Sequence, residues 1–141
     1  MQVQSYLIFE GRCEEAIAFY RKAVGAEVVM LMRFKENPDP PPPGVVPHGS
    51  EDKVMHAELR IGDTVLMLSD GMCAGATRFG GFMLSLSVAD EAEADRKFAA
   101  LGDGGRVEVA LGKTFFSPRF GMVTDRFGVT WAVIAQPEAG R

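Results

Sequence analysis

Hydrophobic residues recur with two different periods along the first half of the chain. In one segment, which closes at Gly25, apolar side chains recur at intervals of three and four and predict an amphipathic helix. Two later segments alternate polar and apolar side chains and flank the pair Gly62–Asp63, which predicts a hairpin with a two-residue turn. The predicted elements of this half are a strand, a helix and three strands, at residues 3–9, 13–25, 26–34, 54–61 and 64–70.

The same order of patterns recurs in the second half of the chain. A helix is predicted to begin at Asp90, with Glu93 as the partner in a capping box, and to end at Gly102. A hairpin follows, with its turn at Gly128. The predicted elements of this half lie at residues 81–88, 90–102, 106–111 and 121–134.

Glycine spacing shows how the two halves differ in length. Gly62 follows Gly25 by 37 residues, whereas Gly128 follows Gly102 by 26 residues. The excess of 11 residues falls in a proline-rich segment, 36–52, which predicts a long loop because proline disrupts helices and sheet interiors.

These patterns predict an α+β fold of two tandem βαβββ modules. We expect the first module to span residues 1–72, with the proline-rich loop inside it, and the second to span residues 80–141. A chain of 141 residues has the length of one structural domain, so the two modules are expected to form one together.

Composition narrows the classes of partner. The net charge of −4 and the absence of a basic run argue against nucleic acid. No apolar stretch approaches the roughly 20 residues that a membrane span needs, so no membrane partner is expected. The first residues lack the pattern of a secretory signal, and Cys13 and Cys73 have no metal-type spacing. We therefore expect a cytoplasmic protein with reduced cysteines.

The pair His56 and Glu58 is the most suggestive chemical feature. Residues two apart on a strand lie on the same face, so this pair shares a face with Arg60 and lies opposite Ala57 and Leu59. An imidazole beside a carboxylate can bind a metal, exchange protons or form an ordinary polar pair. The spacing alone leaves these three interpretations open.

Four segments carry a resemblance to a known family, and they read YLIFEGRCEEAIAFYRKAVGAE, KVMHAELRIGDTVLMLSD, GFMLSLSVADEAEA and SPRFGMVTDRFGVTW. Together they resemble the vicinal-oxygen-chelate superfamily, which includes glyoxalase I, bleomycin-resistance proteins and extradiol dioxygenases, and within it the PhnB-like branch. The resemblance implies that the two modules form a cup from a curved mixed sheet, which encloses a ligand or a metal. It also implies a homodimer.

The resemblance also implies where a metal would bind. Metal-using relatives take one His, Glu or Gln ligand from each of four strands, and these positions map onto Ser5, Glu58, Met83 and Ala132. Among the four, Glu58 alone is a competent ligand, whereas a catalytic divalent ion needs about three protein ligands. His56 could add a second ligand, but it lies on the same strand as Glu58. We therefore expect no metal cofactor.

Within such a cup we expect the ligand to contact residues from several strands and from the loop at 113–120. Strand parity and the position of this loop select the predicted ligand-binding residues His56, Glu58, Ser5, Leu7, Met83, Ser85, Phe116 and Arg119. By the same parity Ser87, Thr130, Ala132 and Ile134 line the cup, whereas Trp131 lies on the opposite, core face. Small and apolar groups with a few hydroxyls suit a moderately apolar organic ligand.

The sequence therefore favours a metal-free, PhnB-like protein that binds a small organic molecule of unknown identity. A metal-dependent lyase, isomerase or dioxygenase that uses Glu58 and His56 stays open as an alternative, and so does a resistance protein that sequesters a drug. Whether the ligand is turned over is also open. The sequence contains neither a P-loop nor a dinucleotide-binding fingerprint, which counts against a methyltransferase.

Overall fold

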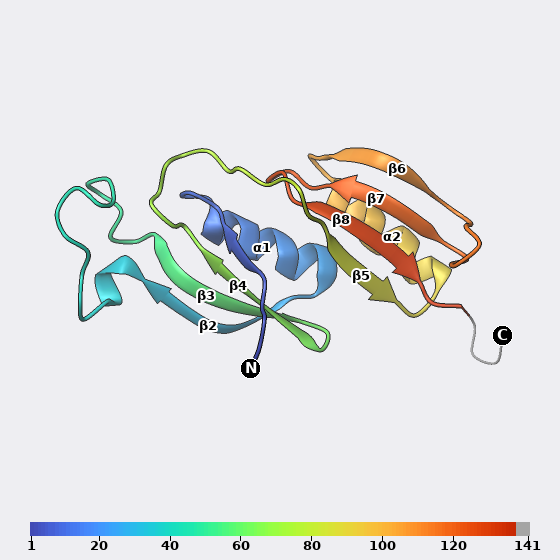
Figure 1. Ribbon diagram of the computed structural model, residues 1–141, viewed down its shortest axis with the longest axis horizontal. Coiled ribbons are helices and arrows are strands. Elements are labelled where there is room, and N and C mark those ends of the chain that lie inside the picture. The colour runs from blue at the N-terminus through green and yellow to red at the C-terminus, as the bar shows by residue number, and fades with distance from the viewer. Residues whose placement is uncertain (138–141) are drawn as a thin grey trace. The chain divides into compact units, whose positions relative to one another are not determined.

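Two units, residues 1–78 and 79–141, make up the computed structural model, which describes residues 1–137 (Figure 1). Each unit contains one α-helix and one four-stranded sheet. This confirms the predicted α+β fold and the βαβββ order of both modules. Within the described residues, no helix combines the length and the apolar character that a membrane crossing requires.

The first unit follows the predicted order closely. Its elements are β1 (Tyr6–Ile8), α1 (Cys13–Val24), β2 (Glu27–Arg33), a short 3-10 helix (Phe34–Glu36), β3 (Val54–Ile61) and β4 (Thr64–Ser69). The sheet order is β1-β4-β3-β2, in which β1 runs parallel to β4 and the other neighbours are antiparallel. The strand β1 has three residues, fewer than the seven predicted at 3–9.

The helix α1 begins at Cys13 and is closed by Gly25, as predicted, but its first turn is capped by a distant residue. Gly25 closes it with a left-handed backbone (φ 70°), a conformation that glycine adopts without steric cost. At the other end Arg12 occupies the N-cap position, and its side chain makes no capping hydrogen bond. The acceptor comes instead from Asp70, a residue 57 positions away from Cys13 that directly follows β4.

Asp70 is a buried carboxylate with three backbone donors. Its Oδ1 accepts hydrogen bonds from the N–H groups of Gly11 and Cys13 at 2.8 and 2.7 Å, and its Oδ2 accepts one from Val54 N–H at 2.8 Å. The residue is 1 % exposed. Because a buried charge is stable only when it is well bonded, these donors and the carboxylate depend on each other. Asp70 therefore joins the ends of β4, α1 and β3.

One face of the first sheet is covered by α1. Ala57 and Leu59 of β3 and Leu68 of β4 are fully buried, and α1 contacts β3 and buries Ala16 and Tyr20. The alternation predicted for β3 is thus confirmed: its odd-numbered residues 57 and 59 face the core, and His56 and Glu58 face the other way.

The second unit repeats this topology. Its elements are β5 (Leu84–Val88), α2 (Glu91–Gly102), β6 (Arg106–Gly112), β7 (Phe120–Thr124) and β8 (Thr130–Ala135), in the sheet order β5-β8-β7-β6. Asp90 caps α2 as predicted, since its Oδ1 accepts a hydrogen bond from Glu93 N–H at 2.8 Å. The carboxylate of Glu93 accepts from Ala89 N–H, one residue earlier than a standard capping box requires. Trp131 is 2 % exposed and lies in the core, as its parity predicts.

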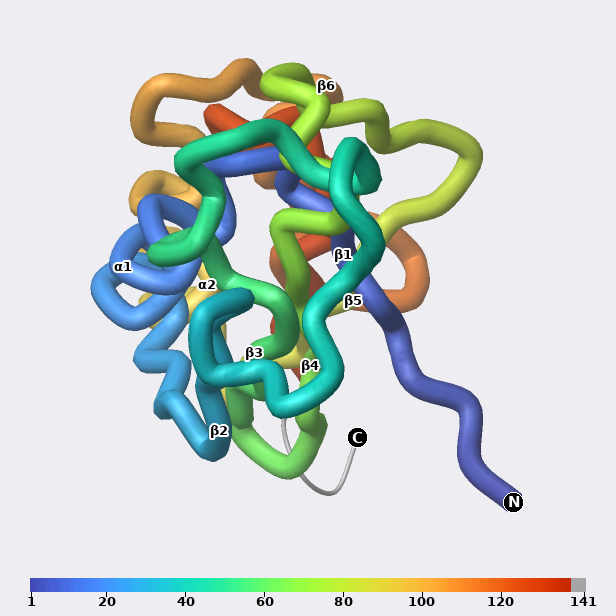
Figure 2. The backbone as a smooth tube through the Cα atoms, turned by 90° about the vertical axis from the view of Figure 1, so that its left-hand side faces the viewer, coloured from blue at the N-terminus to red at the C-terminus, as the bar shows by residue number. Residues whose placement is uncertain are grey.

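The predicted proline-rich loop leaves the 3-10 helix after β2 and returns at β3 (Figure 2). Its two ends are tied together: Arg33 donates to the main-chain carbonyl of Asp52 at 2.7 Å, and Lys35 forms an ion pair with the Asp52 carboxylate at 2.7 Å. Arg33 also binds both carboxylate oxygens of Glu14 on α1 at 2.9 Å. The loop base is therefore anchored to the helix.

We predict that Asp70→Asn lowers the free energy of unfolding by about 2–3 kcal/mol, because it removes the charge and turns an amide NH₂ toward a backbone donor. Urea denaturation followed by circular dichroism measures this loss. Asp63→Asn, at the exposed hairpin turn, is the matched control and should change stability by less than about 0.5 kcal/mol. Equal stability of the two variants would contradict the role assigned to Asp70.

Candidate functional site

Three polar side chains meet on the face of the first sheet that α1 leaves open. Glu58 of β3 pairs across the sheet with Met67 of β4, and Met67 in turn pairs with Tyr6 of β1. Residues paired in this way point to the same side of a sheet. Tyr6 and Glu58 therefore lie on one face, together with His56 two residues before Glu58.

Tyr6, His56 and Glu58 form a continuous chain of hydrogen bonds. Tyr6 Oη lies 2.6 Å from His56 Nδ1, and His56 Nε2 lies 3.0 Å from Glu58 Oε2. The Tyr6 and His56 rings meet edge to face, with centroids 5.4 Å apart. The side chains of His56 and Glu58 are 22 % and 34 % exposed, so the chain of bonds is partly shielded from water but within reach of a ligand.

The chemistry of the three groups assigns donors and acceptors when the imidazole is neutral. An ionised Glu58 can only accept, so His56 donates from Nε2–H and presents the lone pair of Nδ1. Tyr6 then donates its O–H to Nδ1. Burial raises the pKa of the Tyr6 phenol, with a smaller contribution from the negative charge of Glu58, so this hydroxyl keeps its proton at neutral pH.

Methionines surround this chain of polar groups. Met30 of β2 and Met67 of β4 flank Glu58, and Met32 of β2 pairs with His56. All three are partly buried. Methionine is flexible and polarisable, so this lining can adapt to the shape of an apolar ligand.

The structure corrects the predicted placement of β1 by one residue. Leu7 is 2 % exposed and pairs with Leu68 on the core face, and Ser5 lies outside the strand, where its carbonyl accepts from Met67 N–H. Tyr6 therefore lies beside His56 on the face that was predicted for Ser5 and Leu7. The largely apolar strand Tyr6–Ile8 shows no clear alternation of polar and apolar residues. The hydroxyl of Tyr6 was the one signal that could have assigned this residue to the polar face.

The other predicted ligand-binding residues belong to the second unit. Met83 is 47 % exposed and precedes β5, and Ser85 pairs with Ala132 of β8. Arg119 donates to Asp95 of α2 at 2.9 Å, so its charge already has a partner within that unit.

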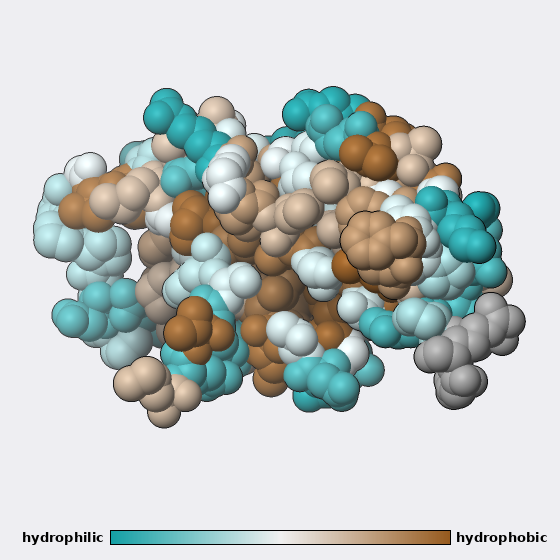
Figure 3. All heavy atoms as spheres, turned by 45° about the vertical axis from the view of Figure 1, so that its right-hand side comes forward, coloured by the Kyte–Doolittle hydropathy of each residue, from teal (hydrophilic) through white to brown (hydrophobic). Residues whose placement is uncertain are grey.

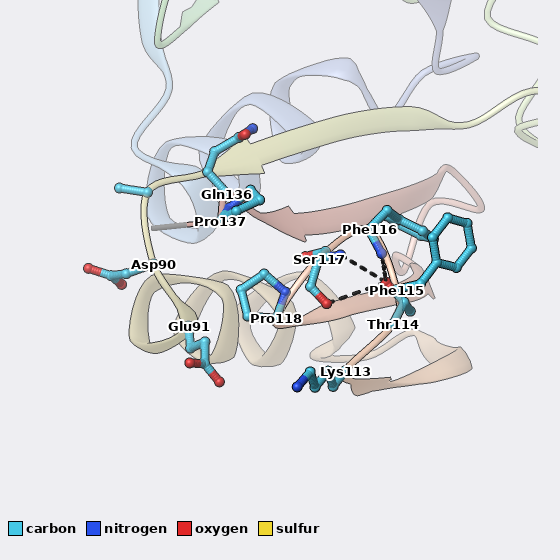
Figure 4. A pocket seen from close by; sticks show the side chains of 11 residues that line it. Asp90, Glu91, Lys113, Thr114, Phe115, Phe116, Ser117, Pro118, Gln136 and Pro137 are labelled. Atoms are coloured by element: carbon cyan, nitrogen blue, oxygen red, sulfur yellow. Dashed lines mark hydrogen bonds between the residues drawn. The ribbon is translucent and has the colours of Figure 1, made fainter. Parts of the chain in front are cut away.

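Phe116 lies in the loop at 113–118, beside a hollow of about 300 Å³ in the second unit (Figure 4). The backbone N–H groups of Phe116 and Ser117 both donate to the hydroxyl of Thr114, and Ser117 donates to the carbonyl of Ala135. These bonds hold the loop in place and leave the ring of Phe115 fully exposed. The start of α2 and the residues after β8 complete the hollow.

The arrangement does not fit a metal centre of the type that the family uses. By sheet order, β1, β4 and β3 correspond to β5, β8 and β7 of the second unit, so the counterpart of Ala132 on β8 lies on β4, whereas Glu58 lies on β3. Both ring nitrogens of His56 are already hydrogen-bonded. Across residues 1–137, no three or more His, Cys, Asp or Glu side chains come together as a group that could hold a metal ion.

Fold and sequence together define a protein built from paired βαβββ modules with a polar chain of groups on one open sheet face. Residues 2–133 match the Glyoxalase/Bleomycin resistance protein/Dioxygenase superfamily, and the chain belongs to this superfamily.

Several relatives match this chain over nearly its full length. Protein YjdN of Escherichia coli is 36% identical in an alignment of 138 positions, and the match covers 94% of each chain. The crystal structure of PA1353 from Pseudomonas aeruginosa is 38% identical with a TM-score of 0.83 and covers 98% of this chain and 99% of its own. The PhnB protein of Bacillus cereus is 28% identical with a TM-score of 0.77, and the match covers 96% of this chain and 99% of that one. The Mn(II)-bound fosfomycin resistance protein FosX of Listeria monocytogenes, at 10% identity, shares the fold alone.

The two cysteines should differ in reactivity. Cys13 is fully buried at the start of α1, and burial, reinforced by the negative charge of Asp70, raises the pKa of its thiol. We predict that iodoacetamide modifies the partly exposed Cys73 in the folded protein and reaches Cys13 only after unfolding, because the thiolate is the reactive form. Mass spectrometry of the labelled peptides measures both rates, with Cys73→Ser as the control. Equal labelling of both thiols in the folded state would show that Cys13 is not sequestered.

Proposed function

We propose that this protein is a PhnB-like small-molecule-binding protein that holds its ligand on the open face of the first sheet, without a metal. The observation that carries this proposal is the hydrogen-bonded chain of Tyr6, His56 and Glu58. It supplies directional polar contacts from two strands, whereas the methionines around it supply apolar contact area. This combination is typical of small-molecule sites, in which a few placed polar groups orient a mostly apolar ligand.

Energetics supports a binding role for the polar chain. The histidine and glutamate lose part of their hydration, and the bonds of the chain recover only about 0.5–3 kcal/mol each. A sheet face that served stability alone would gain more from apolar side chains at these positions. We infer that the three groups are kept for recognition.

The two free cysteines also suit the reducing cytoplasm, where we expect the protein to act.

We predict that a thermal-shift screen of small metabolites and aromatic drugs identifies compounds whose binding depends on this face. Tyr6→Phe and His56→Ala should each weaken binding about tenfold, the equivalent of one hydrogen bond. Isothermal titration calorimetry measures the change. His48→Ala is the matched control, because His48 is exposed in the proline-rich loop.

Three outcomes would contradict the proposed function. The first is a broad screen without any ligand, and the second is binding that neither variant weakens. The third is stoichiometric Zn, Ni, Mn or Fe in protein purified without chelators, lost on Glu58→Gln, which would establish the metal-dependent alternative.

We also propose that the protein is a homodimer. Hydrophobic side chains reach the surface, where they appear brown among teal polar ones in Figure 3. On the edge strands β2 and β6 the exposed residues include Val28, Val29, Val107 and Val109. Edge strands with apolar side chains are suited to association with another chain.

We predict a particle of about twice 15.3 kDa in size-exclusion chromatography with light scattering. Val28→Lys or Val107→Lys should shift the protein toward the monomer, because a lysine placed in an apolar contact must be desolvated. Glu51→Gln, at an exposed position in the proline-rich loop, serves as a control. A wild-type monomer of 15.3 kDa would contradict the dimer.

A further inference from the structure

The hydroxyl of Tyr6 is the exposed end of the polar chain. Tyr6 is 46 % exposed, whereas both nitrogens of His56 are engaged by Tyr6 and Glu58. A ligand on this face therefore meets the oxygen of Tyr6 before it can meet the imidazole. What that oxygen offers to a ligand depends on where its single proton points.

The protonation state of His56 decides this direction. With a neutral imidazole, Tyr6 donates to Nδ1 at 2.6 Å, and its oxygen can only accept from a ligand. With a protonated imidazole, both ring nitrogens donate, so Nδ1–H bonds to the oxygen of Tyr6 and the phenolic proton turns outward. The same hydroxyl then becomes a donor to the ligand.

The net charge of the His56–Glu58 pair changes together with the hydrogen bonding of Tyr6, and both changes favour an anionic ligand when the imidazole is protonated. The neutral imidazole leaves the site with the negative charge of Glu58, whereas the protonated imidazole brings the sum of the pair to zero. Within the first unit, the charged groups on this face besides Glu58 are Arg60 of β3 and Glu27 of β2, which form an ion pair with each other at 2.9 Å. The neighbours of the pair on β2 and β4 are the uncharged Met30, Met32 and Met67.

We propose that Tyr6 is the contact residue for a small organic anion whose carboxylate-type oxygen accepts its hydrogen bond, and that His56 takes up one proton from solvent when this ligand binds. The proposal rests on the proposed function of the same face and adds the ligand class and its proton linkage. Glu58 acts as the positioning residue, because its carboxylate holds Nε2–H and so directs Nδ1 toward Tyr6. The raised pKa of the Tyr6 phenol is consistent with this role, since the hydroxyl retains a proton to donate.

The tautomer of His56 provides a test that needs no ligand. Long-range ¹⁵N–¹H NMR spectra of the neutral His56 ring should show the proton on Nε2 and a hydrogen-bonded, unprotonated Nδ1. Tyr6→Phe should shift the Nδ1 resonance and leave that of His48, the second histidine and an exposed internal reference, unchanged. A neutral ring with its proton on Nδ1 would overturn the proposal, because Tyr6 would then point outward in both states.

Benzoate and the matched cation benzamidinium test the ligand class directly. Benzoate should shift the resonances of Tyr6 and Met67, and its affinity should fall as the pH rises, with a limiting slope of about tenfold per pH unit, as the uptake of one proton requires. Benzamidinium should bind more weakly at low pH. Benzoate affinity that does not change with pH, or the absence of benzoate shifts on this face, would overturn the inference. If neutral compounds still bind there through Tyr6 and His56, the proposed function stands and the anion-linked relay alone is wrong.

Discussion

The first unit depends on one buried carboxylate. Asp70 follows β4 and accepts three backbone hydrogen bonds, two from the segment that starts α1 and one from the first residue of β3. An unpaired carboxylate or three unpaired N–H groups in this position would be costly, so the three chain segments are held together or lost together. This constraint places the helix over one face of the sheet and leaves the other face open.

The polar side chains of the open face are brought together because β4 lies between β1 and β3 and pairs with both. Because β1 runs parallel to β4 and in register with it, Tyr6 is brought to the row that contains Met67 and Glu58. The phenol and the imidazole are 50 residues apart in the chain and 2.6 Å apart in space. A strand of three residues is thus enough to complete the polar chain, provided that its register is set by its neighbour.

The two modules share a topology but use their aspartates differently. In the second module Asp90 caps α2 from the preceding residue, so the helix needs no distant acceptor. The buried Asp125 instead accepts from the N–H groups of Phe127 and Val129 and from the indole of Trp131, and so stabilises the β7–β8 turn and the core. On β5 and β7, the counterparts of β1 and β3, the residues that pair with Ala132 of β8 are Ser85 and Met122. The repeat therefore preserves the fold, whereas the polar chain belongs to one module.

Local patterns in the sequence determined most of the architecture. Both helices, the two hairpins and the long loop follow from periodicity, glycine and proline, because these signals act within a few residues. Parity alone placed His56 beside Glu58. The tertiary structure decided the rest: the register of β1, the contact of Tyr6 with His56 and the capping of α1 by Asp70. Each of these is a pairing between residues about 50 or more positions apart, and the alternation within a three-residue apolar strand carries too little information to specify it.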